Sequence, residues 1–162
     1  MIQTVIQIAI EAGDAILEIY KQDIVVETKS DNSPLTIADK NANEIIVAGL
    51  KKLDSSIPVI SEENKLTNYA ERSKWTSCWI VDPLDGTKEF IKKNGEFTVN
   101  IALVENGVPV LGVVHVPAQN VTYYAERNKG SFKIENGVTQ QLHIRKLAED
   151  GILKIVGSRD RK

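Results

Sequence analysis

The apolar positions near the N-terminus recur with the period of an α-helix. From about residue 2 to residue 21 they share one face, which predicts an amphipathic helix. A short strand, Ile24 to Thr28, is expected next, followed by a polar loop that runs to Pro34. A second set of apolar positions, from Ala38 to Leu53, again shares one helical face. The second predicted helix carries Asp39 near its start.

From Pro58 the pattern changes to short strands. Val59-Ile60 predicts a strand that ends in Ser61-Glu62-Glu63, and Ser77 to Val81 predicts another that ends in Asp82-Pro83. Residues 64–74 between them are polar and turn-like, which is typical of a surface segment. Both predicted strands therefore place carboxylates at the point where the strand stops.

The second half of the chain is predicted to be mostly β-structure. After a short helix near 87–93, apolar and polar residues alternate over 97–103, and Glu105-Asn106-Gly107 predicts a turn into the strand Val108 to Val116. Asn136-Gly137 marks a second hairpin, because Asn-Gly readily adopts the positive φ angles of a type I′ turn. A last strand is expected from Leu153 to Val156. The predicted fold class is α+β, with two helices packed on a largely antiparallel sheet.

Composition narrows the class of protein. The 162 residues fit one ordinary domain, and 42% hydrophobic with 26% charged residues is typical of a globular chain. The balance of 20 Lys+Arg against 22 Asp+Glu argues against binding a nucleic acid polymer. Cys78 is the single cysteine, which excludes an intramolecular disulfide and fits a reducing cytosol. Polar residues interrupt the apolar N-terminus, so we expect neither a signal peptide nor an integral membrane segment.

The stretch from Trp79 to Phe90 holds the most unusual chemistry. Asp82 and Asp85 leave a predicted strand three residues apart, and a rigid turn at Pro83 can aim both carboxylates and the Leu84 carbonyl at one point. Oxygen donors of this kind suit Mg²⁺. Gly86-Thr87 then opens a helix, whose free backbone N–H groups form an anion site. Sites for a cation and a phosphate would then be adjacent.

A structural interpretation competes with this chemical one. Asp85 and Thr87 can cap a helix while Asp82 ends a strand, and Glu62-Glu63 can be a solvated turn. The joint occurrence of these acids with Asp39 favours chemistry, because side-by-side strands would gather four or five acids at one sheet edge. Their mutual repulsion would be costly without cations.

Other candidate residues carry structural predictions. His115 and His143 are the only histidines, so a zinc site built on histidine is not expected, and each is predicted to be a surface or sheet residue. Cys78 is predicted to lie in the core, and the two tryptophans are predicted to pack rather than to stack on bases. Lys88 stays open between a contact to substrate phosphate and a solvated helix charge.

These motifs resemble a known family. Ser33 to Asp39, Ser61 to Glu63, and Trp79 to Phe90 resemble, in order and spacing, three motifs of the lithium-sensitive, Mg²⁺-dependent phosphomonoesterases related to inositol monophosphatase. The resemblance runs through essentially all of the chain. Asp85 to Ile91, followed by Gly95 to Leu103, looks like the bacterial 3′(2′),5′-bisphosphate nucleotidase branch of that superfamily.

The resemblance implies a set of metal ligands. Glu62, Asp82 and the Leu84 carbonyl match the ligands of the activating Mg²⁺, while Asp82 and Asp85 match ligands of a second ion. The complete enzymes of the family use two or three Mg²⁺ ions.

The resemblance also implies roles in substrate binding and catalysis. Asp85, Gly86 and Thr87 match a turn that contacts the phosphate, and Lys88 is included with them as a substrate-binding residue. Thr87, helped by Asp39 or Glu62, matches the group that orients the attacking water.

The family pattern also includes a Trp-Asp motif in a second, α/β domain, and no tryptophan follows Trp79 here. Residues 1–150 are therefore predicted to be an N-terminal domain that binds metal and phosphate, and residues 151–162 the start of a C-terminal domain that is otherwise absent. A chain of this kind is expected to bind Mg²⁺ weakly and to have reduced activity or none.

The leading hypothesis is hydrolysis of the 3′-phosphate of adenosine 3′,5′-bisphosphate to AMP and phosphate. A non-catalytic metal-binding fragment and an inositol-phosphate or sugar-bisphosphate phosphatase are the alternatives. The expected partner is a small phosphorylated nucleotide, and the oligomeric state is left open. The expected location is the cytoplasm, with a peripheral position at the inner membrane as the alternative.

Overall fold

The computed structural model describes residues 1–22, 34–65 and 67–144. The helices are α1 (Ile2–Tyr20), α2 (Pro34–Leu53), α3 (Tyr69–Arg72), α4 (Thr87–Ile91) and the 3₁₀ turn η1 (Pro117–Gln119). The strands are β1 (Val59–Ser61), β2 (Ser77–Asp85), β3 (Thr98–Glu105), β4 (Val108–Val116), β5 (Val121–Glu126), β6 (Gly130–Glu135) and β7 (Val138–Leu142). The strands predicted at 24–28 and 153–156, and the domain boundary predicted at residue 150, lie outside the described residues.

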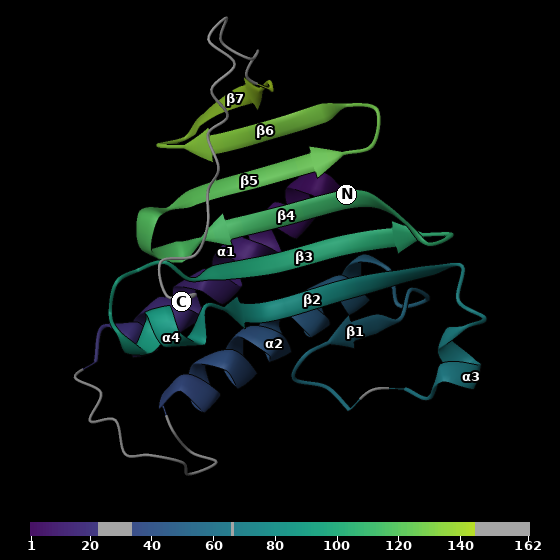
Figure 1. The fold of residues 1–162 in the computed structure, drawn as a ribbon, viewed down its shortest axis with the longest axis horizontal. Helices are drawn as coiled ribbons and strands as arrows, with labels where there is room; N and C mark the ends of the chain where they lie inside the picture. Colours follow the sequence, from purple (N-terminus) through teal and green to yellow (C-terminus); the bar gives the residue numbers. More distant parts are fainter. Residues whose placement is uncertain (23–33, 66, 145–162) are drawn as a thin grey trace, which may run out of the picture.

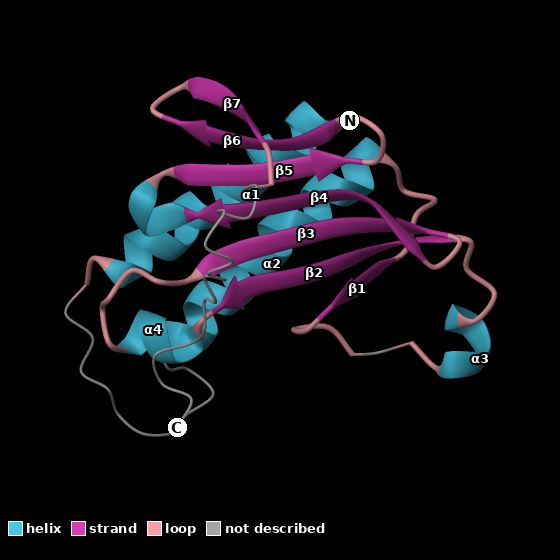
Figure 2. Cartoon of the chain, turned by 45° about the horizontal axis from the view of Figure 1, so that its top comes forward, coloured by secondary structure: helices cyan, strands magenta, loops and turns pink. Residues whose placement is uncertain are grey.

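The seven strands form one sheet in sequence order, with α1 and α2 together on one face (Figures 1 and 2). β1 pairs with β2 in parallel, and every later neighbour in the sheet pairs antiparallel. Helix α2 packs on β2, and α1 packs on β3 and β4. The predicted α+β fold of two helices on a largely antiparallel sheet is confirmed.

The core lies between the helices and the sheet. Alternate residues of β3, namely Val99, Ile101 and Leu103, point into it and are at most 2% exposed. The two helices approach closely at Gly49, where a Cβ atom would lie only 2.7 Å from Cγ1 of Ile8. The apolar periods of the sequence therefore correspond to the buried faces of the actual elements.

The two predicted hairpin turns are confirmed. Asn106 and Gly107 have φ values of 49° and 75°, and Asn136 and Gly137 have 51° and 74°. These positive angles at both central residues match the right-handed twist of the flanking strands.

The end of β2 differs from the sequence prediction. The strand does not stop at Val81 but continues to Asp85. Asp82 pairs with Asn100 and Asp85 with Thr98, so one extra residue of β2 is accommodated as an irregularity between the two acids. Pro83, which has no N–H for the ladder, lies in that irregular segment. The rigid segment between the acids is a bulged strand rather than a turn.

The segment 64–74, predicted to be turn-like and on the surface, is mostly exposed where the structure describes it and contains the single helical turn α3. One smaller prediction was wrong. Cys78, predicted in the core, is only half-buried, because it lies on the sheet face opposite to the one that packs Trp79 against the helices. Trp79 is fully buried, as predicted for a packing residue. No helix in the described part of the chain is long and apolar enough to cross a membrane.

Candidate acidic metal site

Acidic residues from three segments meet where β1 and β2 end beside α2. Asp39 lies in the second turn of α2, and Glu62 and Glu63 follow β1 directly. Because β1 and β2 are parallel, with Ser61 opposite Val81, their carboxyl ends reach the same edge of the sheet. The Glu62 N–H donates to the Val81 carbonyl oxygen over 3.3 Å, which ties the first acidic segment to β2.

The environment of Asp39 disfavours its charged form. The pKa of this carboxyl is raised to about 7, chiefly by burial and next by the Glu63 charge. A hydrogen bond with Glu63 and the charges of Asp82 and Glu62 contribute smaller parts of the same shift. Burial, together with repulsion from Glu63, Asp82 and Glu62, therefore disfavours the charged form of Asp39.

Asp82 shows the same effect to a smaller degree. The pKa of Asp82 is raised to about 6, chiefly by burial, with the charges of Asp85, Glu62 and Glu63 acting in the same direction. A hydrogen bond from the Leu84 backbone N–H opposes the shift. The carboxylates of Asp39, Asp82, Asp85, Glu62 and Glu63 thus form one electrostatic cluster, as the sequence predicted for this sheet edge.

Two oxygen atoms of the cluster fit a cation. Oδ1 of Asp39 and Oδ1 of Asp82 are both buried and have no hydrogen-bond partner. Buried carboxylate oxygens without a donor are costly, and a hard divalent cation such as Mg²⁺ would relieve both the missing partner and the repulsion.

The acids are neighbours but do not form a closed cage. Within residues 1–22, 34–65 and 67–144, no three His, Cys, Asp or Glu side chains converge closely enough to hold one metal ion. Mg²⁺ keeps several waters and commonly uses one or two carboxylates together with substrate phosphate, so it does not need an all-protein cage. The donor set therefore fits Mg²⁺ better than an ion that requires many protein ligands.

The segment after Asp85 is an exposed turn into α4. Asp85 is held by Asn100, whose Nδ2 donates to Asp85 Oδ2 over 3.3 Å. Gly86 adopts a φ of 100°, and a Cβ there would lie 2.9 Å from the Glu96 carbonyl oxygen, so only glycine fits. Thr87 and Lys88 follow with exposed side chains. The roles of Gly86, Thr87 and Lys88 in substrate binding stay predictions.

Some residues of the site were missed. The sequence interpretation assigned Glu62 a role and left Glu63 without one. The charge of Glu63 nevertheless raises the pKa of Asp39 more than any other charge does. Asn100 was missed too, and its place opposite Asp82 depends on the register of β3. The sequence alone does not show which of the adjacent acids Glu62 and Glu63 interacts more strongly with Asp39, because that depends on the direction in which the turn runs past α2.

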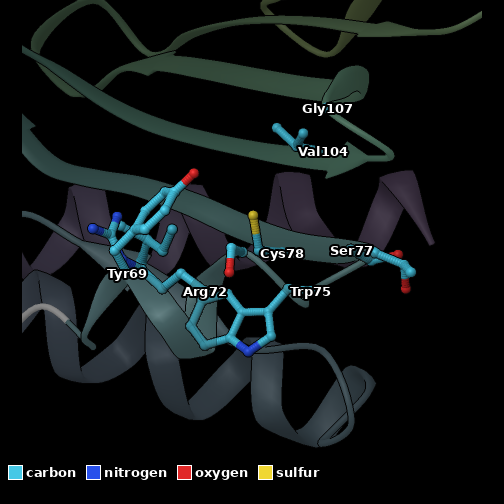
Figure 3. Close-up of a pocket in the computed structure, with 10 residues that line it drawn as sticks. Tyr69, Arg72, Trp75, Ser77, Cys78, Val104 and Gly107 are labelled. Atoms are coloured by element: carbon cyan, nitrogen blue, oxygen red, sulfur yellow. The ribbon is translucent and has the colours of Figure 1, made fainter.

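A separate cavity of about 240 Å³ lies at the other end of β2. The side chains of Tyr69, Trp75 and Cys78 surround it, as Figure 3 shows. None of the predicted site residues lines this cavity. Trp75 is therefore a pocket-lining residue that is half-buried, in contrast to Trp79 in the core.

Comparison with known sequences gives a consistent match. Residues 1–160 match the model of the inositol monophosphatase family. The chain is 49% identical over 147 residues to the protein named 3′(2′),5′-bisphosphate nucleotidase CysQ of Escherichia coli K12, and the match covers 90% of this chain and 59% of that protein. A protein of the same name from Aggregatibacter actinomycetemcomitans is 40% identical over 159 residues, which cover 98% of this chain and 59% of the relative. The chain thus spans a little under three fifths of the length of these relatives.

Solved structures resemble the fold in the same way. The crystal structure of CysQ from Bacteroides thetaiotaomicron superposes with a TM-score of 0.76 at 52% identity, over 83% of this chain and 48% of that one. The SuhB protein of Bartonella henselae superposes with a TM-score of 0.67 at 30% identity, over 81% of this chain and 50% of that one.

Proposed function

Since the chain belongs to the inositol monophosphatase family, we propose that it serves in the Mg²⁺-dependent hydrolysis of a phosphate monoester, the 3′-phosphate of adenosine 3′,5′-bisphosphate, to AMP and inorganic phosphate. The observation that carries the proposal is the acidic cluster with two buried, unpartnered oxygens, on Asp39 and Asp82. The name of the relatives that are about 50% identical, such as CysQ of Escherichia coli K12, supports a nucleotide as the substrate.

In this proposal the metal ligands come from the turn after β1 and from the end of β2. Glu62, Asp82 and the Leu84 carbonyl would hold one Mg²⁺, and Asp82 with Asp85 would hold a second. Bound Mg²⁺ would supply charge neutralisation at the phosphate oxygens and a lower pKa for the attacking water. The Leu84 backbone supports this arrangement because its N–H already orients the Asp82 carboxylate.

The remaining residues bind and orient the reactants. The exposed Thr87 hydroxyl orients the water, helped by Asp39 or Glu62. Gly86, which has no side chain, lets the phosphate approach the backbone of the turn, and Lys88 offers a positive charge to the substrate. The exposure of Thr87 and Lys88 supports these roles, since both side chains are accessible to a ligand.

Phosphate release from adenosine 3′,5′-bisphosphate tests the proposal. The 162-residue chain is assayed with and without Mg²⁺, beside Asp82→Asn and the control Asp54→Asn, an exposed acid at the far end of α2. We expect slow Mg²⁺-dependent release, in line with the reduced activity expected of this chain, that is lost in Asp82→Asn and kept in Asp54→Asn. Mg²⁺ binding with no phosphate release would overturn the proposal in favour of a non-catalytic metal-binding fragment. Faster release from inositol 1-phosphate would instead assign the chain to an inositol-phosphate phosphatase.

The proposal places the protein in the cytoplasm, which the single, half-buried Cys78 supports. No observation on the described residues supports a peripheral position at the inner membrane.

A further inference from the structure

Asn43 connects helix α2 to the segment that carries Glu62 and Glu63. The Ser61 hydroxyl donates to Asn43 Oδ1 over 2.7 Å, and Asn43 Nδ2 donates to Asn64 Oδ1 over 3.1 Å. The amide oxygen of Asn43 therefore binds the residue before the two glutamates, and its amide nitrogen binds the residue after them. Both contacts are partly shielded from solvent, which makes them stronger than exposed ones.

The same segment is braced from within. The Asn64 N–H donates to the Ser61 carbonyl oxygen over 3.2 Å, and the Glu63 N–H lies 3.4 Å from the Ser61 hydroxyl oxygen as a weak donor. Ser61 itself is only 1% exposed. Residues 61–64 thus form a compact turn with a buried attachment point, although the Glu62 and Glu63 side chains are exposed.

The attachment is on the same face of α2 as Asp39. Asn43 follows Asp39 by four residues, so both side chains lie on one side of the helix, one turn apart. The Glu63 charge repels that of Asp39. The hydrogen bonds of Asn43 attach the turn to the helix one helical turn away from Asp39 and oppose this repulsion.

The charge state explains why an amide is suited to this position. Repulsion between Asp39 and the two glutamates tends to drive the turn away from α2. A carboxylate at residue 43 would add to that repulsion, whereas the neutral amide supplies two hydrogen bonds without adding a charge.

We propose that Asn43 is a positioning residue for the metal-binding carboxylates: through Ser61 and Asn64 it holds the Glu62–Glu63 turn against Asp39. The inference rests on the proposed function, because it assumes that these acids bind a divalent cation. Groups that orient metal ligands typically change metal affinity by 10- to 100-fold when they are removed.

The test measures the affinity of the 162-residue chain for Mn²⁺, from the electron paramagnetic resonance signal of the free ion. The variants are Asn43→Ala, Ser61→Ala, the double variant and Asn64→Ala. Asn41→Ala is the matched control, since Asn41 is an exposed asparagine on the same helix. Circular dichroism at the titration temperature identifies variants that have lost the fold. Because Asn64 is not in the core, its variant keeps the test decisive if the others unfold.

We expect Asn43→Ala and Ser61→Ala each to weaken Mn²⁺ binding about tenfold. The double variant is expected to be no weaker than either single one by more than about twofold, since both remove the same link. Asn64→Ala should weaken binding by a few-fold, and Asn41→Ala should leave it unchanged. Wild-type affinity in a folded Asn43→Ala or Asn64→Ala overturns the inference.

The outcome separates this inference from the proposed function. If Asp82→Asn weakens Mn²⁺ binding but the Asn43 and Asn64 variants do not, the metal site stands and only the positioning role is wrong. If the wild-type chain binds no Mn²⁺, the metal site and the positioning role are overturned together.

Discussion

The ammonium group of Lys93 lies over the ring of Tyr20, 4.7 Å from its centroid. The same group donates hydrogen bonds to the main-chain oxygens of Tyr20 and Gln22, the second over 2.8 Å. Lys93 also has a φ of 55°, which residues other than glycine seldom adopt. One strained residue just after α4 thus holds the C-terminal end of α1 to the segment that follows Asp85-Gly86-Thr87.

Two substitutions separate the contacts of Lys93 from its backbone strain. Lys93→Ala loses the contacts and keeps the strain, so we expect the free energy of unfolding to fall by about 1–2 kcal/mol. Lys93→Gly also loses the contacts but relieves about 1 kcal/mol of strain, so it should be less destabilised. Urea unfolding of both variants measures the difference. A glycine variant less stable than the alanine variant would show that the positive φ carries no strain.

Gly86 is expected to be the least replaceable residue of the turn from Asp85 to Lys88. In Gly86→Ala the new Cβ meets the Glu96 carbonyl oxygen at 2.9 Å and the Phe97 Cα at 3.1 Å, in addition to the strain of a positive φ. We expect a loss of about 2–4 kcal/mol in unfolding free energy. Gly107→Ala is the control, since its φ is also positive but nothing lies within 4 Å of the new Cβ. Equal losses in the two variants would exclude the close contact as the cause.

The raised pKa of Asp39 predicts how stability depends on pH without metal. Between about 4 and 7 the folded chain binds more protons at Asp39 than the unfolded chain does, because its pKa rises from 3.8 to about 7. Stability from this group is therefore full below pH 4 and is lost as the pH rises to 7. The difference in stability between the wild type and Asp39→Asn, measured by thermal unfolding at several pH values in buffer containing a chelator, isolates the contribution of Asp39. Mg²⁺ should stabilise the wild type more at pH 7.5 than at pH 5. Equal stabilisation by Mg²⁺ at the two pH values would contradict this explanation of the pH dependence.

The lowered pKa of His115 predicts that stability depends on pH in the opposite direction. It is 2% exposed, and its Nδ1 lies 2.9 Å from the Thr122 hydroxyl oxygen. Burial lowers its pKa below 6.5, against the opposing charge of Asp14 and a backbone hydrogen bond with Val121. The unfolded chain then binds the proton more readily, so stability is lost as the pH falls below about 6.5. We expect this loss to be absent from His115→Asn and retained in the exposed control His143→Asn, as followed by thermal unfolding. A loss retained in His115→Asn would assign it to another group.

His115 also illustrates the limit of sequence reasoning. Its place on a strand was predicted, but its burial was not, because that depends on the close approach of Gly13. A Cβ on Gly13 would lie 2.7 Å from Cδ2 of His115. A contact between residues that are far apart in sequence leaves no periodic signal in either segment.

The two helices, the hairpin turns and the acidic segments were accessible from the sequence, since each depends on local periodicity or on the φ preferences of Asn and Gly. The gathering of the acids also followed once the order of the strands was assumed. The sequence did not determine that β2 continues through Pro83. The bulge there depends on how β2 pairs with β3, where Asp82 lies opposite Asn100 and Asp85 opposite Thr98.

Nor could the sequence assign the contact of Glu63 with Asp39, or the link from Asn43 to Ser61 and Asn64. Local patterns select helix, strand and turn because those choices depend on neighbouring residues in the chain. The distances that give carboxylates their pKa values and amides their partners depend on how separate elements pack, and only the tertiary structure decides them.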